Sequence, residues 1–169
     1  MNNYKDVTKE WLKRATPNSH KIIIRDYIIV DKIKYKINSK NKNVIHDYTN
    51  NELKIAKWLK NTFGGKIYLN PRVNFPQKIS TSDYIFKNKR YDLKTIYGSG
   101  SRTIKKSVKK AKMQANNFII DVTNSNLSFE EIKKQIDSIY SNSSVKKIDI
   151  IIIKRKNNFI IYKNNKKSC

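Results

Sequence analysis

The segment Ser80–Lys94, STSDYIFKNKRYDLK, decides how the rest of the chain is interpreted. Residues 82–86 (SDYIF) and residues 90–94 (RYDLK) have the composition of two short strands. The polar residues 87–89 lie between them, and Asn88 is well suited to a turn. The segment therefore predicts a β-hairpin.

Three charged side chains of this hairpin are candidates for catalysis. Pairing across the turn would bring Asp83 and Asp92 to similar heights, and Lys94 shares a face with Asp92 because side chains alternate along a strand. Two carboxylates and an ammonium on one face suit a divalent cation, a water and a scissile phosphate. The alternative is a surface hairpin with a cross-strand ion pair, worth well under ~1 kcal/mol.

The charge of the chain indicates a polyanionic partner. Its 169 residues include 37 Lys and Arg against 13 Asp and Glu, a formal net charge of +24. Such an excess is typical of nucleic-acid binders, although a Lys- and Asn-rich background with a solvated basic surface would give it too. The single cysteine, Cys169, excludes an internal disulfide, and the two histidines, His20 and His46, are far apart, so a Cys- or His-based metal site is not expected.

No membrane partner is expected. The longest apolar run, residues 148–153, is too short to span a bilayer and contains Asp149. The first residues, MNNYKDVTKEW, lack the apolar core of a signal peptide. We expect a protein that is cytoplasmic or is delivered into a target-cell cytoplasm.

The chain divides by pattern into three parts. Residues 1–48 predict a small β-rich extension, residues 49–163 the main α/β domain, and residues 164–169 a basic tail. The extension is expected to hold a short helix over residues 6–14. Its strands are expected at residues 22–24, 27–30, 33–37 and 44–48.

The main domain is expected to open with a helix from Asn51, capped by Thr49 or Asn50 and ended by Gly64 and Gly65. Glu52 lies in its first turn. Its carboxylate either interacts favourably with the helix dipole or is a third acidic group at the metal site. A strand over residues 66–69 and a loop over residues 70–81 lead to the hairpin.

A loop of small residues, Gly98–Ser101, is expected to precede a helix over residues 103–115. That helix has an apolar stripe and no acidic residue. Its lysines form either a solvated surface or, as we favour, a phosphate track; they are Lys105, Lys106, Lys109, Lys110 and Lys112. The remaining elements are a strand over 118–122, a helix over 128–140 and strands over 148–154 and 159–162.

The order from residue 51 onward is helix, three strands, helix, strand, and it resembles the αβββαβ core of the PD-(D/E)xK nuclease superfamily, with a mixed central sheet. The resemblance implies that Asp83 and Asp92 bind a divalent metal, usually Mg²⁺, with Glu52 assisting. It also implies that Lys94 positions or activates the water and that Gln114, on the second helix, supports the site.

A closer resemblance covers residues 44–162. The runs PRVNFPQKISTSDYIFKNKRYDLKT, GSGSRTIKKSVKKAKMQANNFIIDVT and LSFEEIKKQIDSIY are similar to C-terminal tRNase toxin domains of contact-dependent growth inhibition (CdiA-type) proteins. Related modules are fused to phage head proteins. The resemblance implies an RNA-cleaving endonuclease acting on tRNA and an inhibitory immunity protein as partner.

Some toxin tRNases of this kind have a barnase/EndoU/colicin/RelE-like fold and need no metal. In that version general acid-base catalysis and phosphate binding would fall to Lys94, Thr95, Ser101, Arg102 and Thr103. The expected nucleic-acid-binding residues are Thr95, Ser101, Arg102, Thr103, Lys105, Lys106, Lys109 and Lys112. The sequence is also compatible with a non-catalytic nucleic-acid-binding protein and with a phage or mobile-element component whose charge neutralises DNA.

Overall fold

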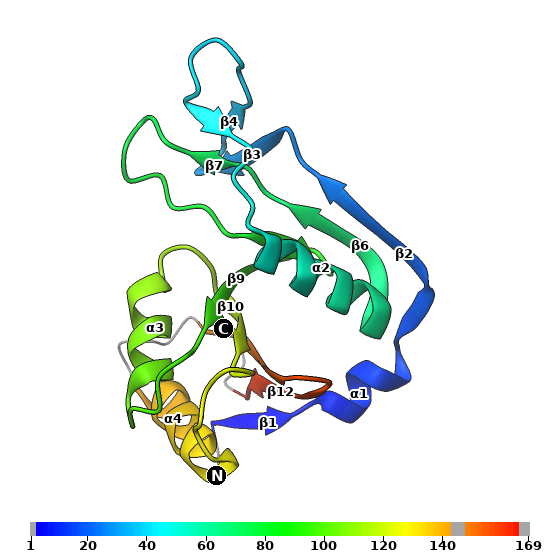
Figure 1. The fold of residues 1–169 in the computed structure, drawn as a ribbon, viewed down its shortest axis with the longest axis vertical. Coiled ribbons are helices and arrows are strands. Elements are labelled where there is room, and N and C mark those ends of the chain that lie inside the picture. Colours follow the sequence, from blue (N-terminus) through cyan, green and yellow to red (C-terminus); the bar gives the residue numbers. More distant parts are fainter. Residues whose placement is uncertain (1–2, 143–147, 166–169) are drawn as a thin grey trace. The chain divides into compact units, whose positions relative to one another are not determined.

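The structure, a computed structural model, describes residues 3–142 and 148–165, and the chain forms two compact units. Unit 1 comprises Met1–Trp11 and Asp92–Cys169, and unit 2 comprises Leu12–Tyr91. This grouping differs from the expected division at residues 48 and 163. It arises because the first strand pairs with the last one, so the start of the chain packs with the C-terminal half (Figure 1).

Unit 2 is built on a mixed sheet with the strand order β9-β8-β6-β2. β2 runs parallel to β6, and the β6–β8 and β8–β9 pairs are antiparallel. The bounds are β2 Thr16–Ile24, β6 Gly64–Leu69, β8 Tyr84–Phe86 and β9 Lys89–Thr95, of which the last crosses into unit 1 after Tyr91.

Helix α2 (Asn50–Phe63) has the ends that the sequence predicts. Thr49 and Glu52 form a reciprocal capping box, and Gly64 ends the helix at φ +73°. Its apolar stripe is buried, with Leu59 fully inaccessible. The stripe packs against the sheet, where the Phe63 and Phe86 rings lie 6.1 Å apart.

Two small sheets complete unit 2. β3 (Tyr27–Val30) and β4 (Ile33–Lys36) form a hairpin, and β5 (Val44–Ile45) pairs with β7 (Arg72–Val73). The strands expected at residues 27–30 and 33–37 are therefore confirmed. The strand expected over 44–48 is shorter, and β7 lies in the segment for which the sequence predicts a loop.

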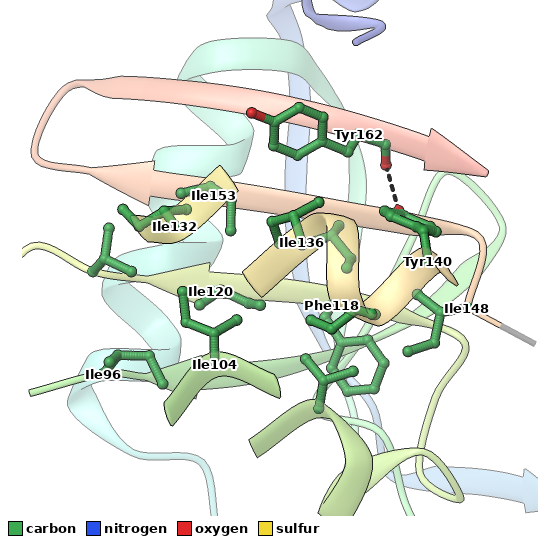
Figure 2. Close-up of a cluster of buried hydrophobic side chains, with 14 of the residues drawn as sticks. Ile96, Ile104, Phe118, Ile120, Ile132, Ile136, Tyr140, Ile148, Ile153 and Tyr162 are labelled. Carbon is green, nitrogen blue, oxygen red and sulfur yellow. Dashed lines mark hydrogen bonds between the residues drawn. The ribbon is translucent and has the colours of Figure 1, made fainter. Parts of the chain in front are cut away.

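Unit 1 has the strand order β9-β10-β11-β12-β1, in which β10 and β11 are parallel and the β11–β12 and β12–β1 pairs antiparallel. Helices α3 (Thr103–Ala111) and α4 (Phe129–Ser141) pack on these strands around an isoleucine-rich core (Figure 2). The remaining bounds are β1 Tyr4–Asp6, β10 Asn117–Asp121, β11 Ile150–Arg155 and β12 Asn158–Asn164. Mixed sheets with several helices confirm the α/β (α+β) class. The basic tail expected over residues 164–169 lies mostly outside the described residues.

Three tyrosines hold β1 in unit 1. The Tyr4 ring stacks on Tyr140 at 5.0 Å, and its hydroxyl donates to the Asp137 carboxylate. The Tyr140 hydroxyl donates to the Tyr162 carbonyl at 3.0 Å (Figure 2). Burial, followed by the nearby Asp6 and Asp137 charges, raises the pKa of Tyr162 to about 12. Burial and the Asp137 hydrogen bond raise the pKa of Tyr4 as well.

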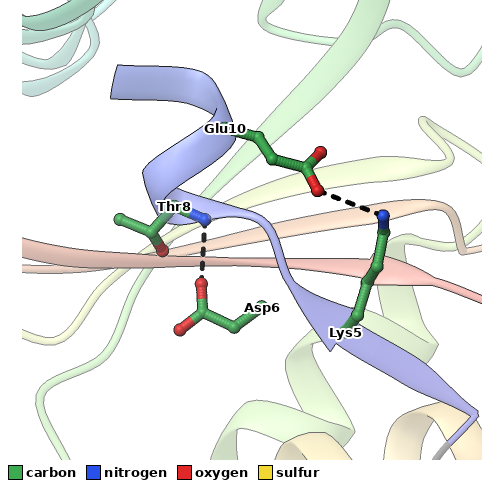
Figure 3. Close-up of polar contacts among 4 residues, drawn as sticks. All are labelled: Lys5, Asp6, Thr8 and Glu10. Atoms are coloured by element: carbon green, nitrogen blue, oxygen red, sulfur yellow. Dashed lines mark hydrogen bonds and ion pairs between the residues drawn. The ribbon is translucent and has the colours of Figure 1, made fainter. Parts of the chain in front are cut away.

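The step from β1 into helix α1 (Thr8–Lys13) is held by local polar contacts. The Asp6 carboxylate accepts a hydrogen bond from the Thr8 amide at 2.8 Å, and Lys5 contacts Glu10 at 3.2 Å (Figure 3). The helix is shorter than the expected span of residues 6–14, because Asp6 belongs to strand β1 and the helix ends at Lys13. No helix in the described part of the chain is both long and apolar enough to cross a membrane.

Candidate active site on strand β9

Asp92 and Lys94 form an ion pair on β9. Lys94 Nζ lies 2.6 Å from Asp92 Oδ2, and the Lys94 and Asp92 side chains are 27% and 3% exposed. Strand alternation thus puts both groups on one face, as the sequence predicts. A carboxylate removed from water needs a compensating charge, and the Lys94 ammonium supplies it.

The hairpin register relates Asp92 to the other predicted carboxylate. Tyr84 pairs with Tyr91, and Asp83 and Asp92 are the next residues outward along the two chain segments. Asp83 itself is not in a strand, because β8 begins at Tyr84 rather than at Ser82. Asn70 holds the residues just before this strand: its side-chain amide donates to the Ser82 carbonyl at 3.0 Å, and its backbone amide donates to the Asp83 carbonyl at 3.0 Å.

Glu52 caps helix α2. Its Oε2 accepts a hydrogen bond from the Thr49 amide at 2.6 Å, and the Thr49 hydroxyl accepts from the Glu52 amide at 3.1 Å. The Glu52 carbonyl accepts from the Tyr84 hydroxyl at 2.8 Å, which ties the first turn of α2 to β8. The capping role is therefore observed, and a role for Glu52 as a metal ligand stays a prediction.

The expectation that Gln114 lies on a helix is wrong. Helix α3 ends at Ala111 rather than at residue 115, and the Gln114 amide closes a turn onto the Ala111 carbonyl at 2.9 Å. The turn redirects the chain into β10, and the asparagines that follow favour a helix less than the preceding residues do. Gln114 Oε1 is buried and has no hydrogen-bond partner among the described residues. Its supporting role stays a prediction.

A buried glutamine that the sequence interpretation missed orders the segment between β9 and α3. Gln135, on α4 and 3% exposed, accepts a hydrogen bond from the Ile104 amide at 2.9 Å and donates to the Gly100 carbonyl at 3.2 Å. Ser125 donates to the Gly98 carbonyl at 2.8 Å. A polar residue inside the apolar stripe of α4 was the available signal.

This clamp affects the predicted phosphate contacts. Because Gln135 accepts the hydrogen bond of the Ile104 amide, one backbone N–H group in the first turn of α3 already has a partner within the protein. Ser101 and Arg102 are exposed ahead of the helix, whereas Thr103 and Thr95 are half-buried. Ser101 and Arg102 are therefore the accessible members of the predicted set in this loop.

The lysines of α3 are not equivalent. Lys105 Nζ donates to Ser138 Oγ on α4 at 2.6 Å, so its ammonium is directed at a neighbouring helix. Lys106, Lys109 and Lys112 are exposed. Lys106, Lys109 and Lys112 are therefore better placed than Lys105 to make the predicted phosphate contacts.

The donor set on β9 and the hairpin suits a hard cation. In the described residues no group of three or more His, Cys, Asp or Glu side chains could hold a metal ion. Magnesium often binds through one or two carboxylates and otherwise through waters and substrate phosphates. Asp83 and Asp92 are carboxylates of the kind that such a site uses, and Mg²⁺ binding by them stays a prediction.

The fold and the site define a mixed α+β protein in which a buried aspartate pairs with a half-buried lysine on a sheet strand. Residues 80–159 match the family model described as the contact-dependent growth inhibition CdiA C-terminal domain. This match confirms, over that segment, the resemblance to CdiA-type C-terminal domains drawn from the sequence.

A solved structure shares the fold. The chain is similar to a chain of the CdiA-CT/CdiI toxin and immunity complex from Burkholderia pseudomallei, with a TM-score of 0.52 and 24% sequence identity. The likeness covers 67% of this chain and 82% of that one. No curated protein matches.

Proposed function

We propose that this chain is a toxin nuclease that hydrolyses phosphodiester bonds of RNA, with tRNA as its substrate class. The observation that carries the proposal is the 2.6 Å contact between Lys94 and the buried Asp92. Both residues lie in the segment that matches the CdiA C-terminal family. A fixed ammonium beside a carboxylate is suited to a reaction that builds negative charge on a phosphate.

We assign the following roles to these side chains. Asp92 holds the Lys94 ammonium in place, and Lys94 orients the attacking water and offsets charge on the phosphoryl oxygens. Asp83 and Asp92 would hold a divalent cation, which supplies Lewis-acid stabilisation and a more acidic bound water. Asp92 and Lys94 lie within strand β9, so the backbone that carries them is held in place before reaction.

Long-range electrostatic attraction brings the substrate to the protein. The net charge of +24 attracts a polyanion from all directions, and the exposed lysines of α3 with Ser101 and Arg102 provide local phosphate contacts. The similar structure from Burkholderia pseudomallei is a complex of a toxin with an immunity protein. We include an immunity protein as partner and the cytoplasm of a target cell as the place of action.

The test is an incubation of the purified chain with total tRNA and, separately, with plasmid DNA, each with Mg²⁺ and with EDTA. We expect tRNA fragments only in the presence of Mg²⁺. Cleavage that continues in EDTA would replace the metal mechanism by general acid-base chemistry. Binding of tRNA without any cleavage would leave a nucleic-acid-binding protein.

A further inference from the structure

The sheet of unit 2 has two faces of different character. Ile67 and Leu69 of β6, with Tyr84 and Phe86 of β8, are buried on the face that α2 covers. Side chains alternate along each strand, so the intervening residues point to the opposite face. That opposite face carries no helix of unit 2 and keeps its side chains exposed or half-buried.

The register places basic residues side by side on this second face. Lys21 of β2 is the direct neighbour of Lys66 of β6, and both are exposed. Tyr68 follows on the same face of β6 and pairs with Ile85 of β8. Ile85 in turn pairs with the exposed Arg90 of β9.

A stacked arginine extends the basic row. The Arg25 guanidinium lies 4.2 Å from the centre of the Tyr68 ring and 5.0 Å from that of Tyr27. The Lys34 Nζ atom of the β3–β4 hairpin lies 4.4 Å from the centre of the Tyr27 ring. Stacking on rings fixes the orientation of a guanidinium and leaves its N–H groups available for an anion.

Nothing acidic in these strands offsets the charge. β2, β6, β8 and residues 89–91 contain no Asp or Glu. Like charges directly opposite on neighbouring strands are destabilising, so the Lys21–Lys66 neighbours cost stability in the free protein. Binding a polyanion would reverse the sign of that interaction.

We propose that Lys21, Arg25, Lys66, Tyr68 and Arg90, which we call the outer basic face, form a second RNA-binding surface that contacts the sugar–phosphate backbone of tRNA. The proposal rests on the proposed function for RNA as the ligand. Four of the five residues precede residue 80, so the surface lies mostly outside the family-matched segment. A sheet face that combines cations with aromatic rings is a recurrent RNA-binding arrangement.

The chain offers a matched comparison. Lys21→Gln/Lys66→Gln removes two charges from the outer basic face, and Lys54→Gln/Lys57→Gln removes two exposed charges from α2, on the other side of the same sheet. Both pairs are made in an Asp92→Asn background that suppresses cleavage, together with Arg25→Gln as a third variant. Thermal unfolding of each variant reports that the fold is retained.

The readout is tRNA affinity by fluorescence anisotropy at several KCl concentrations. For Lys21→Gln/Lys66→Gln we expect the slope of log K against log[salt] to fall by about 0.7–0.9 per lysine, and a weaker affinity for Arg25→Gln. Lys54→Gln/Lys57→Gln should change the slope much less. Equal slopes for the two double variants would overturn the proposal.

Two further outcomes separate this surface from the proposed function. Cleavage of tRNA by the wild-type chain with unchanged affinity in the outer-face variants would overturn the surface and spare the nuclease. If the wild-type chain did not cleave tRNA but the outer-face variants bound tRNA more weakly, the nuclease proposal would be overturned and the RNA-binding surface would stand. Tighter binding of duplex DNA of the same length than of tRNA, with the same loss in the outer-face variants, would overturn RNA as the occupant.

Discussion

Lys94 Nζ lies 2.6 Å from Asp92 Oδ2, two residues away on β9, and the Asp92 side chain is only 3% exposed. A contact of this kind makes Lys94 an electrostatic group held in a fixed place. Groups of this kind typically contribute ~10²–10³ in rate. We therefore expect Lys94→Ala to lose roughly that factor in single-turnover cleavage of tRNA at saturating protein.

The same variant should still bind RNA and metal. Removing an ammonium that competes for the Asp92 carboxylate should leave Mg²⁺ affinity equal or slightly tighter. Lys89→Ala, at the start of the same strand, is the matched control and should cleave normally. A Lys94→Ala protein as fast as the wild type would show that the pair is structural only.

The α3 lysines should separate into two groups. Lys106→Gln/Lys109→Gln removes exposed charges, and we expect weaker tRNA binding with a salt slope lower by about 0.7–0.9 per lost contact. Lys105→Gln removes the hydrogen bond to Ser138 and should change the slope less. If all three positions left the slope unaltered, this face would be merely solvated.

Gly64 and Gly65 should respond differently to alanine. Both have positive φ, but a Cβ at Gly64 would lie 1.9 Å from the Thr16 carbonyl oxygen, whereas one at Gly65 meets nothing within 4 Å. The backbone strain of a non-glycine residue costs about 1–3 kcal/mol at either position. Gly64→Ala should lower the free energy of unfolding by clearly more than Gly65→Ala in urea denaturation; equal losses would contradict the steric argument.

The tyrosine cluster of unit 1 predicts that the folded protein loses stability at alkaline pH. The pKa of Tyr162 is about 12 in the folded chain against 10.0 for the free side chain, so the folded state holds this proton more tightly. That stabilisation is complete below pH 10 and is lost as the pH rises from 10 to 12. The melting temperature of Tyr162→Phe should fall less steeply over this range, and Tyr97→Phe, at an exposed tyrosine, should match the wild type.

Local chemistry explains what the sequence predicted well. The hairpin followed from alternation and a polar turn, and the α2 boundaries followed from Thr49 and Gly64, because each signal acts within a few residues. The Asp92–Lys94 pair needed only the strand period.

Long-range pairing explains what the sequence did not show. β1 is only three residues long and forms a strand because it pairs with β12. The end of α3 likewise depends on how the chain enters β10. The clamp by Gln135 joins residues more than 30 positions apart. A single glutamine in an apolar stripe indicates a buried hydrogen bond without naming its partner.

Asp92→Asn provides the most direct test of the central claim that the Asp92–Lys94 site hydrolyses RNA. The amide keeps the shape of the side chain but is a poorer ligand for a hard cation and a weaker partner for Lys94. Single-turnover cleavage of tRNA in Mg²⁺ is measured beside thermal unfolding and tRNA affinity, with the exposed Asp26→Asn as control. We predict a loss of ~10²-fold or more for Asp92→Asn, with fold and affinity retained. Cleavage by folded Asp92→Asn at the wild-type rate would contradict the account.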